Sequence, residues 1–205
     1  GTMVLGAGAN TLAVDTLVVG LYKGNGTVKF ASQTAGSSGT VTIGGRTRET
    51  AELVVGSKGA MPSGAVASGT LDLRGHAATI NAGTVTIGRE DNNTGIPYSG
   101  GAVGTVYFDG GSFAMTNLTM AYRSGLNTGV NAKATATLSV SGGEVTVREN
   151  GSFTLATQSG TGSATATLNL GGGTLRTYAD ILTGPSNCTS TINLSGGLLD
   201  MTGRA

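Results

Sequence analysis

A short pattern that recurs along the whole chain constrains its fold more than any other feature. Threonine, an apolar residue, any residue and a second apolar residue follow one another seven times, starting at Thr2, Thr27, Thr70, Thr105, Thr137, Thr167 and Thr191. Successive copies begin 24 to 43 residues apart. Because side chains alternate across a strand, the two apolar residues of a copy share one face. The pattern predicts short strands that bury one face in a repeat architecture.

Two further alternating tetrads follow each copy after a glycine-rich corner. Val145 and Val147 are the apolar pair of one second strand, and Phe153 and Leu155 are that of one third strand. Of 40 inward positions defined in this way, 38 are apolar; the exceptions are Thr177 and Thr183. No charged residue falls among them, so we expect these positions to form one continuous core.

Three short strands per repeat leave no residues for helices. The sequence therefore predicts an all-β, right-handed parallel β-helix, a solenoid of about seven coils of three short strands. Glycine, 37 of 205 residues, suits corners where the chain turns sharply. The short corners between first and second strands would also fit hairpins, which leaves an antiparallel sandwich or propeller as the alternative fold.

Composition excludes several functional classes. Only 11% of residues are charged and the net charge is +1, so nothing here neutralises a run of phosphates and we expect no nucleic-acid binding. No apolar run reaches 18 residues, so this segment is not expected to insert into a membrane. One cysteine excludes an internal disulfide framework, and we expect no cofactor and no metal site.

The ends of the chain indicate that residues 1–205 form a single β-helix segment of a longer repeat protein. The chain begins directly before a first strand, and its last coil lacks a third strand. We expect neither end to carry a polar cap, which makes end-to-end self-association into a fibre a further hypothesis.

The run SGGEVTVRENGSFTLATQSGTGSATATLNLGGGTLRTYADILTG, residues 141–184, resembles the Gly- and Thr-rich repeats of bacterial surface proteins. Those families are autotransporter passenger regions and large secreted β-helix proteins. The resemblance implies export, an extracellular or cell-surface location and a structural or adhesive role, with no catalytic site.

The connections from third strands to the next first strands have unequal predicted lengths, from six to sixteen residues. Because stacked coils place them at one corner, we expect a ridge that binds a glycan or a surface protein. Its residues would be Arg89, Glu90, Asp91, Asn92, Asn93, Tyr98, Tyr122, Arg123 and Asn127. The alternative is that these connections are merely tolerated insertions.

Polysaccharide-degrading enzymes also use β-helix folds, so a lyase or hydrolase is the competing hypothesis. A hydrolase needs two carboxylates close together, and a lyase needs acidic Ca²⁺ ligands plus a basic residue. The outward acids expected on strands are scattered over faces and coils: Asp72, Glu144, Asp200, Glu52 and Asp180. Asp91, Asn92 and Asn93 offer oxygen ligands without a suitably spaced bidentate Glu. We therefore expect no catalytic centre.

The outward threonines that begin the first strands form the most regular predicted surface feature. Ice-binding β-helices order water with two aligned threonines per strand. The position two residues further along is mixed here: Val4, Lys29, Asp72, Tyr107, Ser139, Asn169 and Asn193. We therefore expect the column to stiffen the sheet, with its hydroxyls bonded to neighbours.

Two single residues complete the candidates. His76 has no Cys or other His near it in the sequence, so a metal or triad role is not expected. Cys188 is expected to be an unpaired surface or corner thiol, and the alternative is an intermolecular disulfide with another chain.

Overall fold

The computed structural model describes residues 1–59, 64–92, 100–125, 132–185 and 187–203. The regular structure of these residues is β-strand, in sixteen strands that form one sheet. The strands are β1 (Thr2–Leu5), β2 (Ala9–Ala13), β3 (Thr16–Leu21), β4 (Asn25–Phe30), β5 (Thr40–Gly44), β6 (Ala51–Ser57), β7 (Val66–Asp72), β8 (Ala77–Asn92), β9 (Gly101–Phe108), β10 (Gly111–Gly125), β11 (Lys133–Thr154), β12 (Thr157–Gln158), β13 (Ser163–Thr177), β14 (Ile181–Leu182), β15 (Cys188–Leu194) and β16 (Leu198–Asp200).

All strand pairs among the described residues run parallel, which confirms the β-solenoid and rules out the antiparallel alternatives. The solenoid makes about five turns, slightly fewer than the seven predicted. The strands of the end coils are short: β1 has four residues, β14 two and β16 three.

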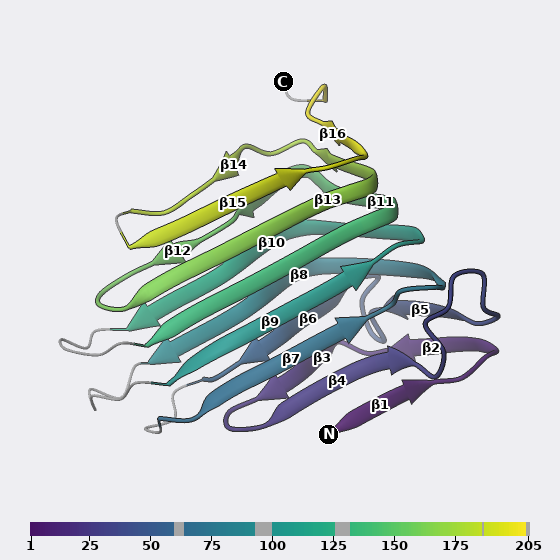
Figure 1. Ribbon diagram of the computed structural model, residues 1–205, viewed down its shortest axis with the longest axis horizontal. Helices are drawn as coiled ribbons and strands as arrows, with labels where there is room; N and C mark the ends of the chain where they lie inside the picture. Colours follow the sequence, from purple (N-terminus) through teal and green to yellow (C-terminus); the bar gives the residue numbers. More distant parts are fainter. Residues whose placement is uncertain (60–63, 93–99, 126–131, 186, 204–205) are drawn as a thin grey trace.

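One side of the solenoid, which we call the front face, is the outward side of the predicted first strands. It comprises β1, β4, β7, β9, the first half of β11, the first half of β13, and β15, stacked one above another (Figure 1). The predicted threonines pair in register from Thr2 with Thr27 at one end to Thr167 with Thr191 at the other. The predicted register, in which each first strand begins with a threonine that lies over the threonine of the previous coil, is therefore confirmed.

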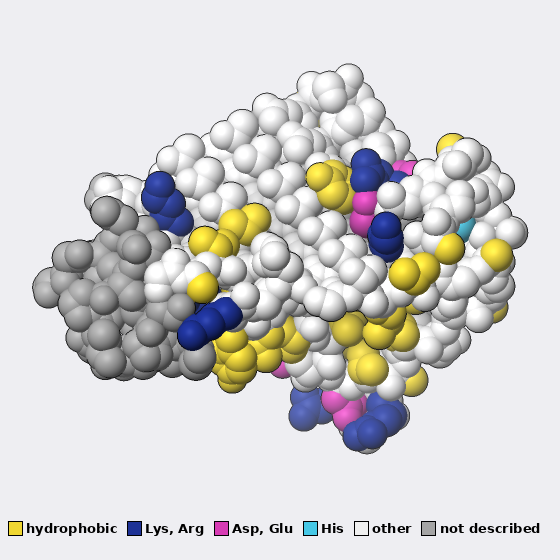
Figure 2. Space-filling model, turned by 60° about the horizontal axis from the view of Figure 1, so that its bottom comes forward, with side chains coloured by type: hydrophobic (Ala, Val, Ile, Leu, Met, Phe, Trp, Pro, Cys, Tyr) yellow, Lys and Arg dark blue, Asp and Glu magenta, His cyan; other side chains and the backbone are white. Residues whose placement is uncertain are grey.

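The core lies along the axis of the coils. Leu138 and Val140 are 0% and 1% exposed, and all four phenylalanines are buried. Burying one such side chain contributes about 1.5–3 kcal/mol, and each coil supplies several. The end coils have a neighbour on one side only, so inward residues such as Met3 and Leu194 stay exposed, at 44% and 60%. Figure 2 shows hydrophobic side chains gathered on the underside of the molecule, where the first coil lies.

Glycine or alanine stands where a third strand turns into the next first strand, and several of these glycines have a positive φ. Gly20, Gly56 and Gly88 have φ of 77°, 73° and 70°. The following first strand passes directly against these corners: a Cβ built on Gly104 would lie 2.2 Å from the carbonyl oxygen of Val55. The corner is thus packed backbone against backbone, with no room for a side chain.

Strands extend further than predicted on this corner side. β8 continues to Asn92 and β10 to Gly125, and β11 already begins at Lys133. Eight residues of each of the predicted connections, which have sixteen and fifteen residues, are therefore strand. The reason is that main-chain pairing resumes after the corner residue, as in the pair Tyr122 with Arg89.

Candidate functional site

The predicted ridge lies where β8 and β10 run side by side beyond their corners. Arg89 pairs with Tyr122, Glu90 with Arg123, and Asp91 with Ser124. The structure therefore brings residues of the two predicted connections together, as expected. Asn92 pairs through its backbone with Gly125. The remaining ridge residues, Asn93, Tyr98 and Asn127, lie outside the described residues.

Two ridge residues do not lie on the surface. Glu90 and Arg123 are both 0% exposed, so the expectation that they contact a partner is wrong. The alternation of the strand resumes after Gly88 and Ala121, and the second residue beyond each corner points inward. Of the described ridge side chains, those of Arg89, Asp91 and Tyr122 remain at least partly accessible. Arg89 and Asp91 form an ion pair with each other.

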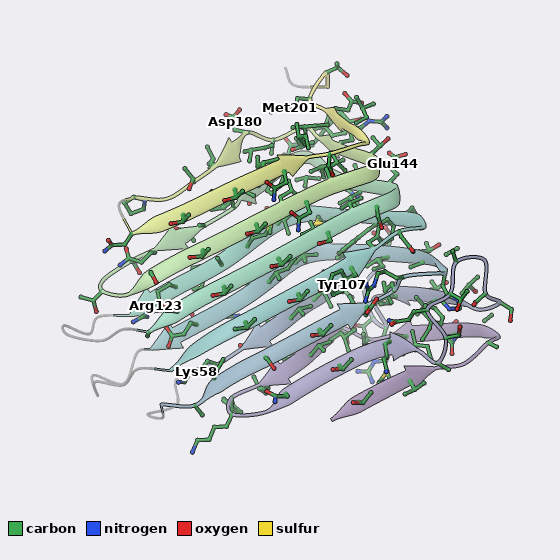
Figure 3. The ribbon with its side chains drawn as sticks, in the orientation of Figure 1. Lys58, Tyr107, Arg123, Glu144, Asp180 and Met201 are labelled. Atoms are coloured by element: carbon green, nitrogen blue, oxygen red, sulfur yellow. The ribbon has the colours of Figure 1, made fainter. Side chains whose placement is uncertain are left out.

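The inward residues beyond the corners form a stack that we call the charged ladder: Lys58, Glu90, Arg123 and Gln158. The pair Ser57 with Arg89 aligns Lys58 with Glu90, and Arg123 pairs directly with Gln158. Nη1 of Arg123 lies 2.8 Å from Oε2 of Glu90, and both side chains are fully buried. Figure 3 shows Lys58 and Arg123 at the same end of the strands.

The charges in the ladder alternate along the axis of the coils. Lys58 is also fully buried, so one carboxylate lies between two cations. Desolvation lowers the pKa of Lys58, while the negative charge of Glu90 opposes that shift and Lys23 adds to it. Taking charges out of water costs several kcal/mol per ion, and pairing in register offsets this cost.

Three ladder side chains also donate hydrogen bonds to the backbone of their own connections. Nζ of Lys58 donates to the carbonyl oxygen of Ala65 at 2.6 Å, directly before β7. Arg123 donates to the carbonyl oxygen of Ser124, and Gln158 to that of Gly160. These contacts hold the ladder side chains against their own connections, and the Glu90–Arg123 ion pair joins two neighbouring coils, which is a structural role.

The charged ladder has a sequence signature, a fixed spacing from the residues that close the third strands, which a search for apolar residues alone does not detect. Each member stands two residues after the Gly or Ala that closes a third strand: Gly56, Gly88, Ala121 and Ala156. The apolar pattern predicts that the strands end at those closing residues. Continuing the alternation past them would have placed all four side chains inside.

A shallow groove on another corner of the solenoid brings acidic and basic groups together. It is lined by Asp15, Thr16, Arg48, Thr50, Ala51, Glu52, Gly83 and Thr84. Oδ1 of Asp15 accepts hydrogen bonds from the backbone N and Oγ1 of Thr47, both at 2.9 Å. These bonds, with the charge of Arg46, lower the pKa of Asp15. Asp15 therefore stays ionised and cannot serve as a general acid near neutral pH.

Other outward acids are engaged by arginines. Arg176 on β13 bridges Glu144 on β11 and Asp200 on β16, at 3.0 Å and 2.9 Å. Asp72 is held by Arg74, whose guanidinium also stacks 4.2 Å above the ring centre of Tyr107. Glu144 and Tyr107 lie toward the end of the strands opposite the charged ladder (Figure 3). These acids serve ion pairs along the faces of the solenoid.

His76 and Cys188 both pack against the core. The His76 ring stacks on Phe30 with centres 3.7 Å apart, and its two nitrogens lie within hydrogen-bond distance of the carbonyl oxygens of Ser32 and Gly39. Cys188 is a free, partly buried thiol, and burial raises its pKa. It pairs with the inward residue Ala164, so it faces the core as well as the corner.

Across the described ranges, no cluster of three or more His, Cys, Asp or Glu side chains is placed to hold a metal ion. Nor does this part of the chain contain a helix long and apolar enough to cross a membrane. Comparison of the chain with known protein families, with curated proteins and with solved structures finds no match.

Proposed function

We propose that the chain is a structural rod within an exported, cell-surface protein, which spans distance and presents adhesive surfaces. The observation that carries this proposal is the uninterrupted parallel ladder of sixteen strands around one apolar axis. The resemblance of residues 141–184 to bacterial surface repeats supports the location.

The geometry suits a load-bearing role. Each coil packs against the coils directly before and after it, so stability grows as a sum of neighbour interfaces. The strands run across the axis, and the hydrogen bonds between coils run along it. The charged ladder fastens the corner that bears Arg89, Asp91 and Tyr122, which we propose as contacts for a glycan or a surface protein.

Single-molecule force spectroscopy tests the rod. The chain, held between two handles, is expected to unfold in successive steps of one coil. With 24 to 43 residues per repeat, each step releases about 80–150 Å of chain. One all-or-none event at low force would contradict the additive rod.

Carbohydrate binding is the second candidate, favoured by the groove that contains Asp15, Arg48 and Glu52. Pull-down on insoluble polysaccharides is expected to retain the chain, and Arg48→Ala is expected to weaken retention. Lys29→Ala is the control, because Lys29 is an exposed cation on β4 that does not line the groove. Release of reducing ends by the chain, but not by Glu52→Gln, would show an enzyme and would overturn the structural assignment.

End-to-end association between copies is a related proposal. Inward apolar side chains left exposed on the first and last coils support it, among them Met3 at 44% and Leu194 at 60%. Sedimentation velocity over a concentration series is expected to show growing rods. A single monomeric species at all concentrations would contradict this proposal and leave the rod itself intact.

A further inference from the structure

The front face carries a second column of threonines beside the predicted one. β11 and β13 begin four residues before the predicted tetrads, at Lys133 and Ser163. The extra length brings Thr135, Thr165 and Thr189 into register with one another, two residues before Thr137, Thr167 and Thr191. We call these six residues the threonine grid. The sequence expectation examined only the position after each predicted threonine and therefore missed the column before it.

The grid is regular in two dimensions. Pairing between β11 and β13 is unbroken from Lys133 to Val140, and between β13 and β15 from Ala164 to Leu170. Neighbouring strands lie about 4.8 Å apart, and residues two apart on a strand lie about 6.6 Å apart. The inward residues between the threonines, such as Ala134 and Ala136, are buried and hold the strands on the core. Figure 1 shows these three strands stacked nearly parallel.

The hydroxyl groups of the grid are available to a ligand. In the described part of the chain, none of the six threonine side chains hydrogen-bonds to another protein group. The expectation that these hydroxyls pair with neighbours is therefore wrong for the grid. The next column differs, because Asn169 donates to Ser139 at 3.2 Å and Asn193 donates to Asn169 at 2.7 Å. This amide column borders the grid, and its side chains hydrogen-bond to one another.

We propose that the threonine grid is an ice-binding surface. Each hydroxyl both donates and accepts a hydrogen bond, as water does, and each γ-methyl group beside it is apolar. The grid and its bordering amide column carry no charge, which suits a neutral lattice of water molecules, and Lys133, an exposed cation two residues before Thr135, marks the edge of this neutral surface. A charged side chain would keep its own hydration shell and disturb that lattice.

Other partners fit the grid less well. Protein partners are bound through aromatic and arginine anchors in pockets, and small molecules through concave sites. Sugar rings stack on aromatic side chains, and Tyr107 is the aromatic residue among the described outward positions of the front face. Its ring is already covered by Arg74. An uncharged and regularly repeating hydroxyl surface matches a crystalline water surface best.

Ice recrystallisation inhibition and ice shaping at millimolar protein test the proposal. The chain is expected to slow crystal coarsening and to facet single crystals. Thr167→Tyr, at the centre of the grid, is expected to reduce both effects at least tenfold, and so is Thr165→Lys. Thr119→Tyr is the matched control, because Thr119 is a partly exposed threonine at the centre of β10 on another face. Circular dichroism and melting curves confirm that each variant is folded.

Three outcomes would overturn the proposal. The first is that the folded chain has no effect on ice at millimolar concentration. The second is that Thr119→Tyr reduces the effect as much as Thr167→Tyr does. The third is retention on crystalline cellulose or chitin that Thr167→Tyr abolishes while ice is unaffected, which would assign the grid to a polysaccharide. None of these outcomes bears on the mechanical steps expected of the rod.

Discussion

Replacing Glu90 by Gln tests the charged ladder most directly. The substitution keeps the shape of the side chain but removes the one negative charge between two fully buried cations, Lys58 and Arg123. Breaking a buried ion pair from one side costs about 3–5 kcal/mol. That is a large share of the roughly 5–15 kcal/mol that stabilise an ordinary domain.

The next residue on β8 supplies the control. Asp91→Asn removes a carboxylate whose partner, Arg89, is 40% exposed, and such pairs contribute about 0–1 kcal/mol. Urea unfolding is followed by far-UV circular dichroism, because the chain has no Trp. The curves are fitted with a nearest-neighbour description suited to repeat proteins. A loss for Glu90→Gln below about 1 kcal/mol, or equal to that for Asp91→Asn, would refute the ladder as a set of buried ions.

The same variant has an expected signature in pH. Because the pKa of Lys58 is lowered on folding, the unfolded chain holds a proton that the folded chain lacks between that lowered value and the ordinary 10.5. Stability therefore rises with pH across this window. Removing the Glu90 charge lowers the pKa of Lys58 further, so the rise is expected to begin at a lower pH in the variant. An unchanged profile would show that Glu90 does not act on Lys58.

Three further predictions test other parts of the structure. Gly104→Ala places a Cβ against backbone atoms of neighbouring coils, so the variant is expected to be about 1–3 kcal/mol less stable in thermal unfolding. The control Gly8→Ala adds a Cβ that meets open space and is expected to leave the stability unchanged. Equal melting temperatures for the two variants would contradict the corner packing. Hydrogen bonds from Thr202 and Arg176 lower the pKa of Asp200 to about 2. The stabilising effect of the Asp200 carboxylate should therefore be complete above its ordinary pKa of 3.8 and disappear as the pH falls through 2. An NMR titration of the Asp200 carboxyl group measures this pKa, and a midpoint near 3.8 would contradict the prediction. Burial raises the pKa of Cys188, so its alkylation near pH 8 should be slower than that of a free thiol peptide; equal rates would indicate an exposed thiol.

The fold was predictable because the core pattern is local. The alternation around Leu138 and Val140 can be read within four residues, and each coil repeats it. The phase of the strands then follows, since a shift of one residue would turn these side chains to solvent. The same reasoning placed Phe30, Phe108, Phe113 and Phe153 correctly inside.

The site residues were harder to predict because their environment is set by other coils. Glu90 looks like a surface residue until Lys58 and Arg123, each more than thirty positions away, align with it. The residues from Ala134 to Ala136 read equally well as a connection, because alanine signals burial weakly. Only the pairing of whole strands shows that these residues continue the sheet and complete the threonine grid.

The constant sequence separation between paired residues of β11 and β13 suggests how a protein of this kind can become longer or shorter. Residues from Lys133 to Val140 each pair with the residue thirty positions later. A duplicated unit of that size would meet the same neighbours above and below, with core and faces already matched. Length is thus a property that this architecture can vary by whole modules, without designing a new interface.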